Sequence, residues 1–120
     1  MAKSVYIFDD DVDILELCRI LLSHKGYEVF TSNNCNEIVE KVLAHAPQVI
    51  IMDNKIPDIG GIEATQELKK HPQLKHIPVI YFSANNDVSI LATKAGADSF
   101  LSKPFDIQTL EEMVVAHIGR

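Results

Sequence analysis

The sequence predicts an α/β sandwich, in which one parallel sheet is covered by helices on both faces. Short runs rich in β-branched residues alternate with longer segments of helical spacing, and this alternation is typical of βαβ units. The runs are almost continuously apolar, as in VIIM at 49–52, which is expected of strands buried on both faces. The chain has 120 residues, the size of a single domain.

Five apolar runs are predicted strands, and each one leads through a turn into a helical segment. The predicted strands are residues 4–8, 27–30, 49–52, 79–82 and 99–102. They recur at intervals of roughly 20 to 30 residues, which leaves room for one crossover helix each. Because such crossovers are right-handed, the helices are expected on both faces of the sheet.

The first helix is predicted between the aspartates at positions 10 and 11 and Gly26. Either Asp10 or Asp11 is a suitable N-cap, and the glycine follows a basic last turn, as is typical of a helix end. Apolar residues recur between them at three- and four-residue spacing, which indicates an amphipathic helix. They are Ile14, Leu17, Cys18, Leu21 and Leu22.

The later helices have weaker start and stop signals. Asn34 followed by Glu37 resembles a capping pair that opens the second helix, and Pro47 closes it. Gly96 is expected to end the fourth helix, and Asp106 to cap the fifth. The last three helices are predicted at 62–70, 87–94 and 106–117.

The composition narrows the class of protein. Eleven Lys and Arg against 17 Asp and Glu give a net charge of −6, which disfavours nucleic acid as a partner because phosphate contacts need clustered basic residues. Apolar runs stay short of the roughly 18 residues that span a bilayer, and no signal peptide is recognisable, so we expect a cytoplasmic protein without a membrane partner. Cys18 and Cys35 are expected in helices as buried thiols, without a disulfide or metal.

Consecutive aspartates at the end of the first strand need an explanation. Two carboxylates about 4 Å apart repel by about 4 kcal/mol at an effective dielectric constant of about 20. A helix cap requires only one of them, and Asp11 suits that role. We therefore expect Asp9 and Asp10 to face a small, hard cation.

Chemically active side chains stand at the carboxyl ends of four predicted strands. They are Asp9 with Asp10, then Asp53, Ser83 and Lys103. In an open parallel sheet, ligands bind beyond these ends, so the five side chains are expected in one crevice. Mg²⁺ takes carboxylate, water and phosphate oxygens. Asp10 and Asp53 are the expected direct ligands, with Asp9 acting through water. Asp53 can then attack phosphorus, while Ser83 and Lys103 bind phosphoryl oxygens.

At this point the sequence resembles the receiver domain of two-component response regulators. The segments that carry the resemblance are FDD at 8–10, IIMDNKIPDIGG at 50–61, PVIYFSA at 78–84 and GADSFLSKPF at 96–105. The resemblance implies a flavodoxin-like, CheY-like (βα)₅ three-layer sandwich with strand order 2-1-3-4-5. It implies one receiver domain over residues 1–120, without an effector domain. Pro57 matches the proline after the third strand, and a cis bond is implied between Lys103 and Pro104.

The resemblance also implies a specific site. Mg²⁺ would be held by Asp10, Asp53 and the carbonyl of Lys55, assisted by Asp9 through water. A histidine kinase or a histidine phosphotransfer protein would phosphorylate Asp53. Ser83 and Lys103 would bind the phosphoryl group.

Signal output is likewise implied by the resemblance. Ser83 would move toward the phosphoryl group and Phe100 would turn inward, changing the face formed by the fourth helix, fifth strand and fifth helix. Lys55 and Asn85 occupy positions that tune the lifetime of the acyl phosphate. The output partner is unknown. The receiver is expected to be a monomer or a weak phosphorylation-dependent dimer. It is not expected to be an enzyme, beyond catalysing the phosphorylation and dephosphorylation of its own aspartate.

Three other functions use the same fold or the same residue types. Phosphatases of the haloacid dehalogenase type also use a Mg²⁺-bound Asp, but in a DxDx[TV] pattern after strand one, where this chain has Asp13 at the fifth place. A flavin-binding domain would need a Ser/Thr/Gly-rich phosphate loop in place of FDDDVD. A pseudo-receiver that binds partners without phosphorylation usually lacks one of the acidic residues or the lysine, and all are present here.

Overall fold

The computed structural model describes residues 3–56, 60–84, 87–103 and 106–118. Its centre is a five-stranded parallel sheet in the order β2-β1-β3-β4-β5, as predicted. The strands are β1 (Ser4–Phe8), β2 (Glu28–Ser32), β3 (Val49–Asp53), β4 (Val79–Ser83) and β5 (Ser99–Ser102). The helices are α1 (Val12–His24), α2 (Ile38–His45), α3 (Gly60–Lys70), α4 (Val88–Ala95) and α5 (Ile107–Ile118).

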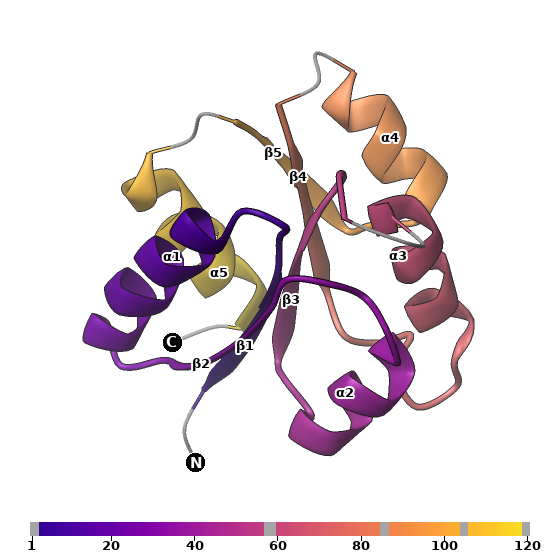
Figure 1. The fold of residues 1–120 in the computed structure, drawn as a ribbon, viewed down its shortest axis with the longest axis horizontal. Coiled ribbons are helices and arrows are strands. Elements are labelled where there is room, and N and C mark those ends of the chain that lie inside the picture. Colours follow the sequence, from indigo (N-terminus) through magenta and orange to yellow (C-terminus); the bar gives the residue numbers. More distant parts are fainter. Residues whose placement is uncertain (1–2, 57–59, 85–86, 104–105, 119–120) are drawn as a thin grey trace.

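Helices cover both faces of this sheet, so the molecule has three layers (Figure 1). α1 and α5 lie on one face, and α2, α3 and α4 lie on the other. Each face has its own apolar cluster between helices and strands. All five residues of β1, β3 and β4 are buried, whereas those of the edge strand β2 are partly or fully exposed. The continuously apolar runs in the sequence are thus explained by burial on both faces.

Asp11 is the N-cap of α1, as the sequence predicts. Its Oδ1 accepts hydrogen bonds from the backbone N–H groups of Asp13 at 2.9 Å and Ile14 at 3.4 Å. Two of the otherwise unpaired amides of the first turn are thereby satisfied. Gly26 follows the helix with φ of +97°, a conformation that glycine adopts at little cost.

The predicted capping pair of α2 is wrong. Asn34 closes its own turn, with Oδ1 accepting from the backbone N–H of Asn36 at 3.0 Å. Lys41 of α2 also donates to this Oδ1 at 2.9 Å, which holds the turn against the helix. α2 therefore begins only at Ile38, preceded by Glu37 in the left-handed region at φ of 54°.

The two cysteines are free and buried, as expected. Cys18 lies in α1, but Cys35 lies in the turn before α2 and not in a helix. It is buried there against Met52, with the two sulfur atoms 3.9 Å apart.

Strand boundaries differ slightly from the prediction. β3 and β4 each extend by one residue and include Asp53 and Ser83, while β2 runs from Glu28 to Ser32 and not from 27 to 30. The backbones of Asp53 and Ser83 therefore belong to the sheet and not to loops, which fixes where their side chains start. Among the described residues, no helix is both long and apolar enough to cross a membrane.

Candidate functional site

Sheet geometry directs three charged side chains to one corner of the molecule. Side chains alternate between the two faces of a strand. Asp9, Asp53 and Lys103 each stand two positions after a strand residue of the cluster under α1 and α5. All three therefore extend rows that face these two helices, and they converge where the strands end.

Lys103 lies between the two aspartates. Its Nζ donates to Asp9 Oδ2 at 2.9 Å and to Asp53 Oδ1 at 2.8 Å. Its backbone N–H continues the ladder with β4 by donating to the carbonyl of Ser83 at 2.9 Å. The ammonium also lies 4.6 Å from the centroid of the Phe82 ring, which adds a cation–π contact.

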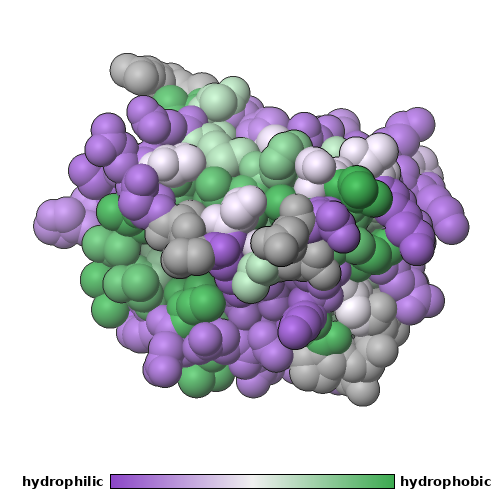
Figure 2. Space-filling model, turned by 90° about the horizontal axis from the view of Figure 1, so that it is seen from above, coloured by the Kyte–Doolittle hydropathy of each residue, from purple (hydrophilic) through white to green (hydrophobic). Residues whose placement is uncertain are grey.

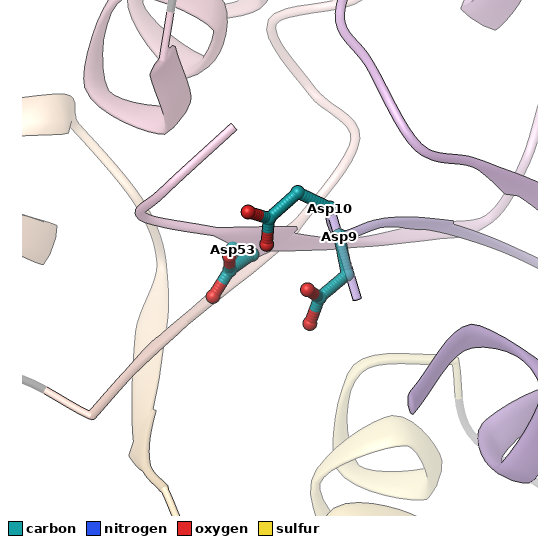
Figure 3. A group of neighbouring side chains, drawn as sticks. All are labelled: Asp9, Asp10 and Asp53. Atoms are coloured by element: carbon teal, nitrogen blue, oxygen red, sulfur yellow. The ribbon is translucent and has the colours of Figure 1, made fainter. Parts of the chain in front are cut away.

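Asp10 completes a group of three carboxylates. One ligand oxygen from each of Asp9, Asp10 and Asp53 lies within 4.8 Å of the other two. Figure 3 shows Asp9 and Asp10 reaching in from the segment after β1, toward Asp53 at the end of β3. Asp9 and Asp53 are buried, whereas Asp10 is exposed. Asp9 Oδ1 also accepts from the backbone N–H of Asp11 at 2.9 Å, so its side chain is held on two sides.

The electrostatics show that one lysine does not balance this group. Burial raises the pKa of Asp9 to about 6, although the hydrogen bonds from Asp11 and Lys103 act in the opposite direction. The pKa of Asp53 is also raised, mainly by burial and despite Lys103. Burial alone would lower the pKa of Lys103, but its hydrogen bonds to Asp53 and Asp9 outweigh this and raise it. The ammonium therefore stays charged, while both carboxylates remain under-compensated.

A cleft of about 280 Å³ opens over these groups. It lies at the edge where the strands end, and Figure 2 looks onto this edge, where hydrophilic and hydrophobic residues lie side by side. The cleft is lined by Asp10, Asp11, Asp53, Lys55, Ser83, Ala84 and Lys103. Carboxylates that line an open cleft and carry excess negative charge suit a hard divalent cation that keeps some of its water, such as Mg²⁺. The donor set therefore fits the predicted metal.

Comparison with known proteins identifies the family. The family model of the response regulator receiver domain matches residues 5–115. The chain belongs to this family. Receiver domains are phosphorylation-dependent signalling modules and not classical enzymes, which excludes the phosphatase interpretation.

Relatives of this receiver domain match it over nearly its whole length. The polar-differentiation response regulator DivK of Brucella anthropi is 32% identical, over 99% of this chain and 98% of the relative. The solved chemotaxis protein CheY4 of Vibrio cholerae is 25% identical with a TM-score of 0.88, over 98% of this chain and 99% of the other.

A solved structure with the same fold contains a metal. The receiver domain of the sensor histidine kinase PA1611 from Pseudomonas aeruginosa has a magnesium ion coordinated in its active-site cleft. It is 22% identical with a TM-score of 0.90, and the alignment covers all of both chains.

The receiver domain brings the main predicted residues together. Asp9, Asp10, Asp53 and Lys103 meet as expected, and Ser83 and Lys55 line the same cleft. Phe100 lies apart from them on β5, with 46% of its surface exposed. Pro57, Asn85 and Pro104, and with them the implied cis bond, lie outside the described residues.

Two features of the site were not predicted from the sequence. A Cβ at Gly61 would lie 2.1 Å from the carbonyl oxygen of Asp53, so only glycine allows α3 to pack so close to the end of β3. Tyr81, from the middle of β4, donates its hydroxyl hydrogen bond to Asn54 Oδ1. An asparagine directly after Asp53, facing a tyrosine in an otherwise apolar strand, is the only signal the sequence offers for this pair.

Proposed function

We propose that this receiver domain is a switch that accepts a phosphoryl group on Asp53 from a histidine kinase or a histidine phosphotransfer protein. Mg²⁺ would be held by Asp10, Asp53 and the Lys55 carbonyl, with Asp9 acting through water. The magnesium in the PA1611 receiver supports the choice of metal. One arrangement supports the proposal most directly: Lys103 Nζ lies 2.8 Å from Asp53 Oδ1 at the floor of an open, acidic cleft.

The chemistry follows from the charges. An ionised oxygen of Asp53 attacks phosphorus, the bond from phosphorus to the donor breaks, and the donor leaves with the electron pair. Bound Mg²⁺ would neutralise charge on the phosphoryl oxygens. The hydrogen bond from Lys103 favours the ionised form of Asp53 against the effect of burial, and the ammonium remains in place to pair with a phosphoryl oxygen afterwards. Ser83, at the end of β4, offers a hydroxyl to another oxygen.

Output would depend on Ser83 and Phe100. A new phosphoryl group attracts the Ser83 hydroxyl, and the space that it leaves would admit the Phe100 ring, which is now 46% exposed. Phenylalanine has no hydroxyl, so its two positions would differ by packing alone. The changed face would comprise α4, β5 and α5, for a partner that the chemistry does not identify.

Phosphorylation in vitro tests the proposal. The protein is incubated with acetyl phosphate and Mg²⁺, and intact mass is compared for the parent, Asp53→Asn and Asp13→Asn. Asp13 is an exposed aspartate of α1 outside the cleft, so its variant is a matched control. We expect the parent and Asp13→Asn to gain one phosphoryl group only when Mg²⁺ is present, and Asp53→Asn to gain none.

Two outcomes would reject the switch. Unmodified parent protein, combined with no calorimetric Mg²⁺ binding, would favour a pseudo-receiver that acts without phosphorylation. Modification of Asp53→Asn to the same extent as the parent would place the phosphoryl group elsewhere.

A further inference from the structure

We propose that Asn54 and Tyr81 are a positioning pair, whose hydrogen bond orients the segment after β3 over Asp53 and thereby tunes Mg²⁺ binding and phosphoryl transfer. The inference rests on the proposed function and extends it to two residues outside the predicted site. Neither residue is a ligand in that proposal, so both would act through the backbone of Lys55.

The geometry of the sheet brings this pair together. Tyr81 is paired in register with Met52 on the neighbouring strand β3. Asn54 stands two positions after Met52, so its side chain lies on the same face of the sheet as the tyrosine ring. The ring is fully buried, and its hydroxyl donates to Asn54 Oδ1 at the end of the strand. Burial and the nearby charge of Asp53 both raise the pKa of Tyr81, so this hydroxyl remains a donor.

Asn54 is held from three directions. Its backbone N–H donates to the carbonyl of Phe82 at 3.1 Å, and its own carbonyl accepts from the N–H of Gly61 at 3.2 Å. The hydrogen bond from the buried Tyr81 hydroxyl to the Asn54 side chain is the third contact. Rotation of Asn54 about the strand axis is thereby opposed on β4, on α3 and in the core.

The consequence reaches the reacting carboxylate through one peptide. The backbone N–H of Lys55 donates a hydrogen bond to the Asp53 carboxylate. Lys55 also lines the cleft, and the proposed metal ligand is its carbonyl. Because Lys55 directly follows Asn54, the orientation of both its amide and its carbonyl depends on how firmly Asn54 is held. Losing one neutral hydrogen bond changes an equilibrium constant, here that of Mg²⁺ binding, by about two- to tenfold.

The test is a double-mutant cycle with a matched tyrosine control. Tyr81→Phe, Asn54→Ala and the double variant are compared with the parent and with Tyr6→Phe. Tyr6 and Tyr81 are both buried in the apolar cluster under α2, α3 and α4, but Tyr6 packs on Phe8 and Phe30. The measurements are the Mg²⁺ dissociation constant by calorimetry, the rate of phosphorylation by acetyl phosphate, and urea unfolding in EDTA.

We expect Tyr81→Phe to weaken Mg²⁺ binding by about two- to tenfold, with a matching loss in phosphorylation rate at low Mg²⁺. The double variant should be no weaker than Asn54→Ala alone, because the two residues act through one bond. Tyr6→Phe should bind Mg²⁺ as the parent does.

The outcomes separate this inference from the function on which it rests. If the parent binds Mg²⁺ and is phosphorylated, but Tyr81→Phe matches it in both and differs only in urea unfolding, the pair is structural and the positioning role is overturned. Additive losses in the cycle would also overturn it. If the parent itself takes up neither Mg²⁺ nor a phosphoryl group, the proposed function falls and the inference falls with it.

Discussion

Two lysines of this receiver domain bind carboxylates at opposite ends of the strands. Lys69 lies where β4 and β5 begin and Lys103 lies where the strands end, and the two groups differ in charge balance. Lys69, at the end of α3, donates to Asp98 Oδ2 at 2.7 Å and to the carbonyls of Ile77 at 2.8 Å and Lys75 at 3.2 Å. Asp98 Oδ2 also accepts from the backbone N–H of Val79 at 2.8 Å. One cation meets one anion, and neutral carbonyls complete the set.

Lys103 is arranged differently, although it is buried to a similar degree. Its side chain is 16% exposed, against 18% for Lys69. It faces two buried carboxylates, and Asp10 adds a third negative charge from the side of the cleft. The Lys69 group is balanced in charge, whereas the Lys103 group has surplus negative charge beside an open cleft.

This difference separates a structural ion pair from a candidate reactive site. A charge-balanced pair with satisfied hydrogen bonds stabilises the beginnings of β4 and β5 and leaves no charge for a ligand to neutralise. Surplus buried charge costs stability, and a bound cation offsets that cost. Residue types alone do not reveal the distinction, because both groups consist of lysine and aspartate.

The largest expected effect is on phosphorylation. Lys103→Met should slow phosphorylation by acetyl phosphate by about 10²- to 10³-fold, because a preorganised charge beside the developing phosphoryl charge is lost. Lys69→Met should leave the rate within about twofold of the parent, since its group faces the opposite edge. Intact mass against time measures both. Similar rates for the two variants would show that charge balance does not distinguish the two sites.

A second difference should appear as a pH dependence of stability. Folding raises the pKa of Asp9 from 3.8 to about 6, so the folded protein binds that proton more tightly than the unfolded chain does. The resulting stability is complete below about pH 4 and is lost as the pH rises through about 6. The loss is at most about 3 kcal/mol, from roughly two pKa units at about 1.4 kcal/mol each.

Urea unfolding in EDTA at several pH values measures this loss. Asp9→Asn cannot titrate, so the parent should lose stability relative to this variant between about pH 4 and 6. Mg²⁺ should reduce the difference, because ligand carboxylates bind the metal only when deprotonated. Parallel curves for the two proteins in EDTA would contradict the raised pKa.

The balanced group should matter for stability alone. Lys69→Met is expected to lower the free energy of unfolding by about 1–2 kcal/mol, because it removes charged hydrogen bonds to a partly exposed aspartate. Its Mg²⁺ dissociation constant should match that of the parent. Lys70→Met, at an exposed position of the same helix, is the control and should change neither quantity. A weakened Mg²⁺ affinity in Lys69→Met would mean that the two edges are coupled.

The smallest effect concerns a third lysine, the exposed Lys55 at the rim of the cleft. A cationic side chain is poorly suited to orient an attacking water and can pair with a phosphoryl oxygen. Lys55→Asn should therefore shorten the lifetime of phosphorylated Asp53, by about two- to fivefold given the modest strength of exposed ion pairs. Decay of the modified mass after removal of acetyl phosphate gives the lifetime, with Lys70→Asn as control. An unchanged or longer lifetime would argue against this role of Lys55.

The sequence was a good guide wherever a local pattern decides the structure. The five strands, the cap at Asp11 and the turn at Gly26 follow from hydrophobic periodicity and capping chemistry. The pattern misled at Asn34, because its side chain is engaged by its own turn and by Lys41 from the following helix. Capping signals do not include such competition between side chains.

What the sequence by itself determined is the set of side chains at the strand ends. In a parallel sheet, strand order and the two-residue alternation assign each of them an edge and a face. Only the tertiary structure decided which charges meet there: Lys103 reaches Asp53 across 50 residues and Asp9 across 94. It alone also pairs Tyr81 with Asn54 and Lys69 with Asp98. Hydrogen bonds and charges act over a few ångströms in space, and distance along the chain does not specify that proximity until the sheet has formed.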